Sequence, residues 1–184
     1  MSQAGIGLGE LDAIVFGRGP GSFTGLRTAC AVAQGLAYGA GVAVLAVDTL
    51  LAVAEQAREQ VGCTQVLAVL DARMDEVYSG AYEFADGRWM RRGELSLDKP
   101  EAVALPAGWT LAGNGFEAYG DRLPQGARLA ALPDAAALLR LAPAMLADGD
   151  AVAAAGALPL YVRDKVAQTT TERAASRAAA AALQ

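Results

Sequence analysis

Three carboxylates are the first candidates for chemistry in this sequence. Asp71, Asp75 and Glu76 lie around Arg73 at an expected hairpin turn. Paired carboxylates can bind a metal ion or act as a general acid and base. The alternative, which we favour, is a solvated turn in which Arg73 pairs locally with its acidic neighbours.

The absence of histidine narrows the possible reactions. None of the 184 residues is a histidine. This excludes Ser-His-Asp and Cys-His nucleophiles, HExxH zinc sites and a histidine general base. The two cysteines, Cys30 and Cys63, lack CxxC spacing and are expected to be buried, reduced thiols. We therefore expect no metal site and no enzymatic activity that depends on these residue types.

A glycine-rich segment is the second candidate site. Gly17-Arg18-Gly19-Pro20-Gly21 separates an apolar run from the start of an expected helix. Backbone amides that converge at a helix N-terminus can bind a phosphate. The segment lacks the lysine of a P-loop, and its spacing differs from a dinucleotide-binding fingerprint. Its spacing alone favours the alternative, a tight turn with positive φ before a helix capped by Ser22.

The elements that position these residues alternate between strand and helix in the first third of the chain. A strand at residues 12–16, a helix from Ser22 to about residue 38, a strand at 42–47 and a helix to about residue 60 predict an α/β lobe with parallel pairing. Later residues predict an antiparallel meander. Its strands are residues 65–70, 77–84 and 88–97, with an Asp86-Gly87 turn. A strand at 109–112 and a helix at 135–146, capped by Asp134, are expected after it.

The first helix has small residues on the surface opposite its core-facing stripe. The predicted inward stripe consists of Leu26, Ala29, Cys30, Ala33, Leu36 and Ala37. On the other surface Ala31, Gly35 and Gly39 recur every four residues. Glycine inside a helix costs about 1 kcal/mol relative to alanine, so Gly35 requires an explanation. We expect another polypeptide to cover this surface; an intrachain helix is the alternative.

Composition limits the partners of the chain. The formal net charge is −5, whereas a protein that binds nucleic acid unaided usually has a basic face. Arg88, Arg91 and Arg92 could contact RNA, but their alternation with Trp89 is more typical of a solvated strand face. No apolar run reaches the roughly 18 residues of a membrane span, and the N-terminus lacks signal-peptide features. A cytoplasmic location is expected.

Several motifs resemble those of the TsaB (YeaZ) family. The most specific are the segment from Gly17 to Arg27 and the Ala33-Gln34-Gly35-Leu36-Ala37 sequence. Supporting matches are residues 71–78, the Gly113-Asn114-Gly115 turn and Pro159-Leu160-Tyr161-Val162-Arg163. The resemblance covers residues 11–167. We assign no chemistry to Tyr161 or Arg163, which are expected to pack the C-terminal segment onto the first lobe.

The resemblance implies an actin/sugar-kinase/Hsp70-like (ASKHA) fold and a non-catalytic role. The chain would be the partner of a catalytic TsaD-type subunit, with a TsaE-type ATPase, in threonylcarbamoylation of adenosine in tRNA. The implied partner interface, also used for a homodimer, is Thr24, Arg27, Thr28, Ala31, Val32, Gln34, Gly35, Tyr38 and Gly39. No cofactor is expected, because ATP would be used by the partners, and tRNA would be reached only through the complex. Nothing in the sequence supports the peptidase activity once ascribed to the family.

The alternative function is an ASKHA-type nucleotide-binding phosphotransferase or ATPase. In an ASKHA cleft the turn around Asp71 would take the second phosphate position. The residues that could then face phosphate are Gly19, Gly21, Ser22, Gly25, Asp71 and Arg73.

The resemblance also predicts the domain organisation. Residues 1–62 would form the remainder of a first lobe, residues 63–168 a second lobe, and residues 169–184 a disordered tail. The opening strand, hairpin and helix of family members have no counterpart before residue 12, so the chain is expected to be N-terminally truncated relative to the family. The edge of the strand at residues 12–16 would then be unpaired, which predicts lower stability.

Overall fold

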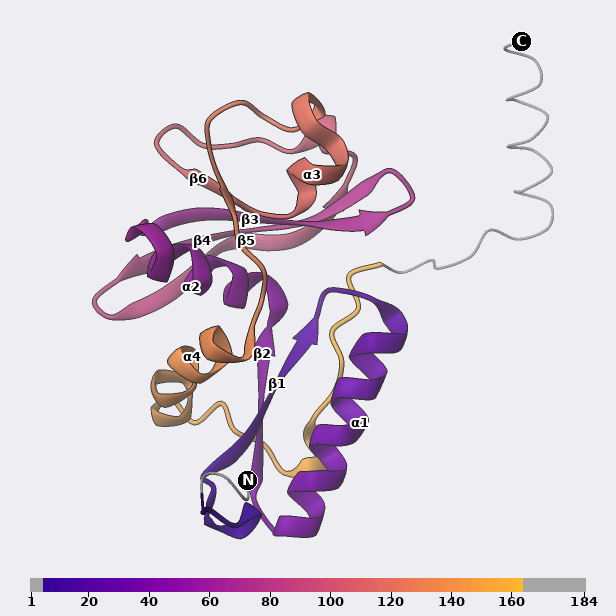
Figure 1. Cartoon of the computed structure of the whole chain (residues 1–184), viewed down its shortest axis with the longest axis vertical. Helices are drawn as coiled ribbons and strands as arrows, with labels where there is room; N and C mark the ends of the chain where they lie inside the picture. The colour runs from indigo at the N-terminus through magenta and orange to yellow at the C-terminus, as the bar shows by residue number, and fades with distance from the viewer. Residues whose placement is uncertain (1–4, 164–184) are drawn as a thin grey trace, which may run out of the picture.

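The computed structural model describes residues 5–163, which are arranged around two β-sheets (Figure 1). The first sheet contains β1 (Ala13–Gly19) and β2 (Ala43–Asp48), which pair in parallel. The helix α1 (Phe23–Ala40) connects them and packs against β1. A parallel pair requires such a crossover connection. The predicted α/β start of the chain is confirmed.

The helix α1 begins where the sequence predicts. The Ser22 hydroxyl accepts a hydrogen bond from the backbone N–H of Gly25, at 3.5 Å, and so caps the helix. The buried side is formed by Leu26, Cys30, Ala33 and Ala37. Leu36, predicted to face the core, is instead 40% exposed, because it lies beside Gly35 on the outward surface.

The second sheet has five strands in the order β5-β4-β3-β6-β7. Its strands are β3 (Gln65–Arg73), β4 (Glu76–Ala85), β5 (Arg88–Asp98), β6 (Thr110–Gly113) and β7 (Ala127–Ala130). The first three form the predicted antiparallel meander, and β6 and β7 add in parallel beside β3. The strand β7 and the short helix α3 (Gly115–Tyr119) were not predicted.

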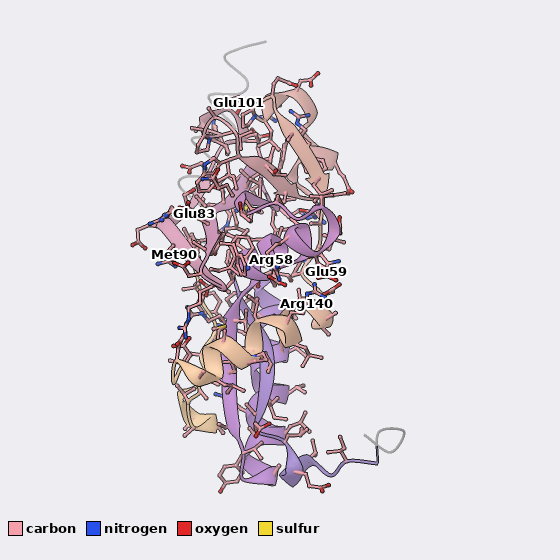
Figure 2. The ribbon with its side chains drawn as sticks, turned by 90° about the vertical axis from the view of Figure 1, so that its left-hand side faces the viewer. Arg58, Glu59, Glu83, Met90, Glu101 and Arg140 are labelled. Carbon is pink, nitrogen blue, oxygen red and sulfur yellow. The ribbon has the colours of Figure 1, made fainter. Side chains whose placement is uncertain are left out.

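Two helices join the sheets. The helix α2 (Thr49–Val61) packs against β3, and α4 (Ala135–Ala147) packs against α2 and the first sheet. Asp134 caps α4 as predicted, since its carboxylate accepts the N–H of Ala137 at 2.7 Å. Figure 2 shows Arg140 of α4 beside Arg58 and Glu59 of α2. The 3-10 turns are Leu8–Glu10, Pro100–Ala102, Gly120–Arg122 and Ala154–Gly156.

Residues 150–163, here called the return segment, lead the chain back to the first sheet. Val152 forms an antiparallel bridge with Val44 of β2. The carbonyl of Ala157 accepts hydrogen bonds from the Cys30 thiol at 3.2 Å and from the Gln34 amide at 2.7 Å. The segment then continues along α1 (Figure 1). It therefore ties the end of the described chain to the first helix.

Within residues 5–163, β1 has β2 as its sole strand partner. None of the helices in these residues combines the length and the apolar composition that a transmembrane segment needs. The predicted division into two lobes stays a prediction, as α4 and the return segment pack on the first sheet although they follow the second in sequence. The predicted tail at residues 169–184 lies outside the described residues.

Candidate functional site

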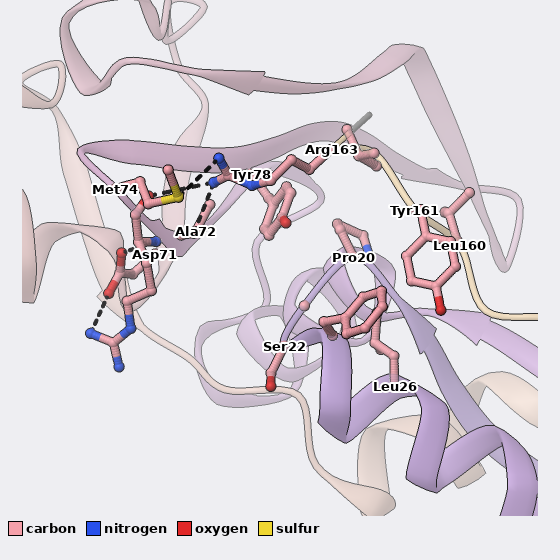
Figure 3. Close-up of a pocket in the computed structure, with 14 residues that line it drawn as sticks. Pro20, Ser22, Leu26, Asp71, Ala72, Met74, Tyr78, Leu160, Tyr161 and Arg163 are labelled. Atoms are coloured by element: carbon pink, nitrogen blue, oxygen red, sulfur yellow. Dashed lines mark hydrogen bonds and ion pairs between the residues drawn. The ribbon is translucent and has the colours of Figure 1, made fainter. Parts of the chain in front are cut away.

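The glycine-rich loop after β1 faces the β3–β4 hairpin across a cleft of about 470 Å³ (Figure 3). Gly21 and Ser22 line one wall, and Asp71 and Arg73 line the other. Residues 160–163 of the return segment form a third wall. The structure thus brings together four of the six residues predicted to face phosphate.

The backbone N–H groups of the other two, Gly19 and Gly25, are already hydrogen-bonded to side chains of this protein. Gly19 has φ 121° and donates its N–H to the Thr49 hydroxyl at 3.1 Å. A Cβ at Gly19 would lie 2.5 Å from the carbonyl oxygen of Leu160, so the return segment approaches the loop backbone closely. The Gly25 N–H belongs to the Ser22 cap. Neither amide is free to bind an anion in this arrangement.

Each of the three candidate carboxylates has its own arginine. Arg73 contacts Asp71 at 2.9 Å, as the sequence predicts. Arg122 binds Asp75 with bonds of 2.5 and 3.0 Å, and Arg163 lies 2.5 Å from Glu76. Asp71 also accepts hydrogen bonds from the Arg73 backbone N–H at 2.8 Å and from the Tyr119 hydroxyl at 2.9 Å. The carboxylates therefore serve to fix the hairpin.

This pairing leaves the cleft poorly equipped for acid–base or metal chemistry. The hydrogen bond from Arg122 holds the pKa of Asp75 below its ordinary value, so Asp75 is a weak proton acceptor at neutral pH. Among residues 5–163, no group of three or more histidine, cysteine or acidic side chains is placed to hold a metal ion.

The second candidate site is the outward face of α1, and most of its predicted residues are exposed. Thr24, Arg27, Thr28, Ala31, Val32, Gly35, Tyr38 and Gly39 are all exposed to solvent. Val32 is 55% exposed and Tyr38 86% exposed, which is unusual for side chains of this size on one helix face. A Cβ at Gly35 or Gly39 would meet no atom within 4 Å. No residue in the described range covers this face.

The edge of the same helix is attached to the return segment. Gln34 is half-buried because its amide bonds to Ala157, so it lies at the border of the face. Arg27 donates to the Tyr161 hydroxyl at 3.1 Å, and its guanidinium lies 3.8 Å from the centre of the Phe23 ring. Tyr161 packs on the first helix as expected, whereas Arg163 reaches the β3–β4 hairpin and donates to the carbonyl of Ala72 at 3.0 Å.

A further apolar side chain belongs to this face and was missed in the sequence: Leu36, which is 40% exposed. Phe23 is 41% exposed but lies at the edge of the face, where its ring packs against Tyr161. The signal was present, because Leu36 follows Val32 at the i,i+4 spacing that places two side chains on one helix face. Val32, Leu36 and Tyr38 together make the outward face more apolar than the small-residue pattern predicts.

The arginines of β5 do not form a free basic patch. Arg92 contacts Glu83 at 2.6 Å, Arg88 pairs with Asp148, and Arg91 lies 3.6 Å from Asp48. Because every one of these guanidiniums faces a carboxylate, the strand presents little unbalanced positive charge for RNA. This agrees with the solvated face expected from the sequence.

Comparisons with known proteins point to one group of relatives. The family model "TsaD: tRNA N6-adenosine threonylcarbamoyltransferase" matches residues 1–181. The Escherichia coli protein named "tRNA threonylcarbamoyladenosine biosynthesis protein TsaB" is 38% identical over 180 residues, covering 91% of this chain and 77% of that protein. The protein of the same name from Haemophilus influenzae is 32% identical over 184 residues, covering 90% and 76%. The solved structure of "YeaZ from Pseudomonas aeruginosa" is 45% identical with a TM-score of 0.81, covering 87% of this chain and 78% of that one.

Proposed function

Because this chain belongs to the TsaB/YeaZ family, we propose that it is a non-catalytic scaffold subunit in the biosynthesis of threonylcarbamoyladenosine in tRNA. In this role it binds a TsaD-type catalytic subunit through the outward face of α1 and activates it. The family model that matches the chain carries the transferase name, which supports a common family for this chain and the catalytic subunit.

One observation carries this proposal: the outward face of α1 combines glycines, which have no side chain, with exposed apolar side chains. Gly35 lies in the interior of an 18-residue helix, where glycine costs about 1 kcal/mol relative to alanine. No described atom approaches the space that its Cβ would occupy, so intrachain packing does not explain this glycine. The neighbouring Val32 and Leu36 are exposed. A helix of a partner fits such a surface, because glycine lets two backbones approach while apolar side chains pack on either side.

The same surface and the net charge of the chain also indicate its other partners. We infer that the isolated chain forms a homodimer through the outward face of α1, in competition with the TsaD-type subunit. A TsaE-type ATPase uses ATP within the complex, and this chain holds no cofactor. The net charge of −5 and the paired arginines of β5 favour contact with tRNA only through the complex.

Activation through docking requires no chemistry from this chain. The three carboxylates of the hairpin at the cleft, Asp71, Asp75 and Glu76, are paired with arginines, and the chain has no histidine. A scaffold can instead bind the active conformation of its partner more tightly than the inactive one and so increase the population of the active state. The active site then belongs entirely to the TsaD-type subunit.

Gly35→Arg is expected to weaken binding to the TsaD-type subunit about 30-fold or more, because a charged side chain would fill the space reserved for the partner's backbone. The variant should fold normally, since arginine is a better helix former than glycine and open space surrounds this position. Binding is measured by co-purification and by calorimetric titration of the two subunits.

A matched control is Ala136→Arg, which adds the same side chain at an exposed position of α4. It should leave the affinity for the TsaD-type subunit unchanged. Wild-type affinity in Gly35→Arg would show that the interface lies elsewhere, and equal loss in both variants would show a nonspecific effect of added charge.

A nucleotide-binding phosphotransferase is the second candidate, and the cleft beside the glycine-rich loop is the observation that favours it. We expect calorimetry of the isolated chain with Mg·ATP to show no binding, because the cleft arginines are engaged by carboxylates and backbone carbonyls. Measurable binding that is lost in Ser22→Ala or Asp71→Asn would instead support the phosphotransferase.

A further inference from the structure

A second hollow, of about 500 Å³, lies where the end of β2 faces β5. It shares no residue with the cleft beside the glycine-rich loop. Its lining residues are Asp48, Leu51, Tyr82, Trp89, Arg91 and two neighbours on β5, Gly93 and Glu94. Apolar and charged side chains therefore meet in one open site.

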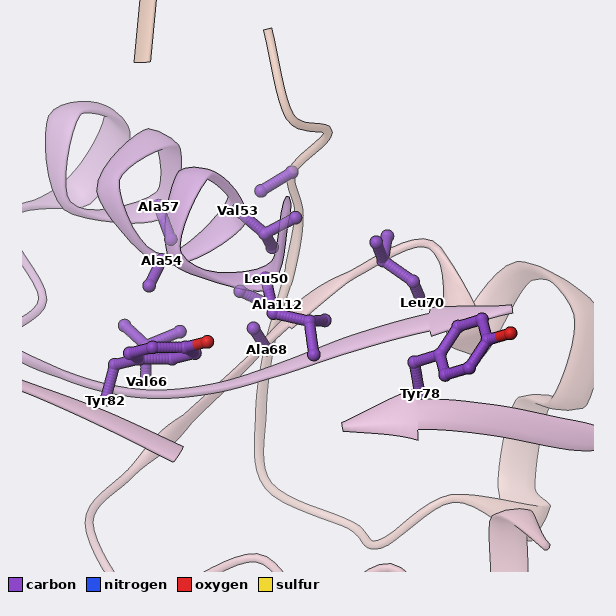
Figure 4. Packing of buried hydrophobic residues seen from close by; sticks show 11 residues of the cluster. Leu50, Val53, Ala54, Ala57, Val66, Ala68, Leu70, Tyr78, Tyr82 and Ala112 are labelled. Atoms are coloured by element: carbon purple, nitrogen blue, oxygen red, sulfur yellow. The ribbon is translucent and has the colours of Figure 1, made fainter. Parts of the chain in front are cut away.

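Tyr82 lines this hollow opposite Arg91 on the neighbouring strand, and its buried hydroxyl is the group that lacks an explanation. Tyr82 is 1% exposed, and its ring packs in the core between the second sheet and α2 (Figure 4). Its hydroxyl makes no hydrogen bond with any described residue. A buried polar group without a partner is costly, and such groups are rare in folded proteins. Burial, followed by the nearby Asp48, raises the pKa of this phenol, so the hydroxyl keeps its proton and remains a donor.

The Arg91 guanidinium beside it has unused hydrogen-bonding capacity. Its Nε donates to the carbonyl of Gly93 at 3.1 Å. Its two terminal nitrogens are 3.6 Å from Asp48 and 3.4 Å from Glu94. Both distances exceed the roughly 2.7–2.9 Å of a strong charge-assisted hydrogen bond. The terminal nitrogens of Arg91 can therefore accept a better partner.

The charges around the hollow favour a ligand with a single negative charge. Arg18 binds Asp48 at 2.6 Å and neutralises it, while Glu94 is 92% exposed and extends into solvent. A ligand carboxylate can take the place of the exposed Glu94 at Arg91, which keeps the charges of the hollow balanced. A dianion such as phosphate would be repelled more strongly by the half-buried Asp48 than a monoanion would.

We propose that this hollow binds a small organic carboxylate. The Tyr82 hydroxyl and the Arg91 guanidinium donate to the carboxylate oxygens, since a planar guanidinium matches the geometry of that group. Leu51 and Trp89 contact the apolar part of the ligand. This binding site is independent of the proposed docking of α1, because none of its residues lies on that helix.

Benzoate is the probe, and its binding to the intact chain is measured by NMR titration. We expect saturable binding, with benzamide, which has the same shape and no charge, at least about tenfold weaker. Tyr82→Phe removes the hydroxyl alone and should weaken benzoate binding about tenfold, and Arg91→Gln should weaken it more. Inorganic phosphate should bind less tightly than benzoate.

The matched control is Arg92→Gln, one residue further along β5, where the arginine pairs with Glu83 instead. It should bind benzoate as the wild-type chain does. The proposal is overturned if benzoate does not bind, if benzamide binds equally well, or if Tyr82→Phe keeps the wild-type affinity. Tyr82→Phe removes only one oxygen from the buried volume, and a circular dichroism spectrum of the variant is the check that it is folded.

Discussion

Gly113→Ala is expected to lower the free energy of unfolding by more than about 4 kcal/mol, enough to prevent this chain from folding stably. Gly113 ends β6 with φ 138°, opposite Val69 of the central strand β3. A Cβ at this position would lie 1.9 Å from the carbonyl oxygen of Val69. That oxygen belongs to the backbone of a strand that is paired on both sides, so it cannot move away without breaking the sheet.

The matched control for this prediction is Gly108→Ala, in the loop before β6. Gly108 also has a positive φ, 82°, but a Cβ there would meet nothing within 4 Å. Its cost should be limited to the left-handed backbone, about 1–2 kcal/mol. Urea denaturation of both variants distinguishes the cost of a left-handed backbone, which both share, from the cost of the contact with Val69, which only Gly113→Ala has. Similar midpoints for the two would contradict the claim that contact with Val69 is what requires glycine at residue 113.

The Gly113-Asn114-Gly115 turn thus has a structural explanation. Gly113 allows the backbone contact with Val69, and Asn114 accepts the backbone N–H of Asp71 through its side-chain oxygen at 3.0 Å. Both contacts fix the end of β3, from which the hairpin at the cleft begins. The motif that supports the family resemblance therefore has a role in packing and hydrogen bonding.

Much of the fold could be predicted from local patterns. The Ser22 cap and the apolar stripe of α1 are local signals, as are the alternation of β4 and the Asp86-Gly87 turn. The short β7 and α3 escaped prediction, because segments of four or five residues have too little periodicity and depend on their neighbours in space.

The candidate sites could be predicted only in part. The outward face of α1 follows from spacing along one helix, whereas the pairing of Asp75 with Arg122 joins residues that are 47 positions apart. The hydroxyl of Tyr82 gives no sequence signal, because alternation places its ring in the core and says nothing about the polar atom at its end. Contacts between segments that are distant in sequence determine which charged side chains are left without an ion-pair partner, and local patterns do not show these contacts.

Glu55 is the clearest case of a residue whose role the sequence hides. A glutamate within a helix is ordinarily exposed to solvent, yet Glu55 is 2% exposed. Its carboxylate accepts hydrogen bonds from Arg58 of its own helix, from Trp89 of β5 at 2.8 Å and from Arg140 of α4 at 3.1 Å. Glu55 therefore connects α2, α4 and the second sheet through one buried carboxylate.

Glu55→Gln is expected to lower the free energy of unfolding by about 3 kcal/mol, because two arginines and an indole N–H would lose their shared anionic acceptor. The control is Glu59→Gln on the same helix, where the side chain is 56% exposed and lies 3.9 Å from Arg140. It should change stability by less than about 0.5 kcal/mol. Denaturant titration at neutral pH measures both, and equal losses would show that burial of Glu55 is irrelevant.

The pH dependence of stability gives an independent test of the same contacts. Burial alone would raise the pKa of Glu55, but the hydrogen bonds from Arg58 and Trp89 outweigh it and lower the pKa. A group whose pKa is lower in the folded state stabilises the fold above its unfolded pKa, and the contribution is lost as the pH falls through the folded value. The wild-type chain should therefore lose stability below about pH 4.5, the ordinary range of a glutamate, and Glu55→Gln should lack this part of the loss. Parallel acid profiles of the two proteins would mean that the carboxylate is not held by these donors in solution.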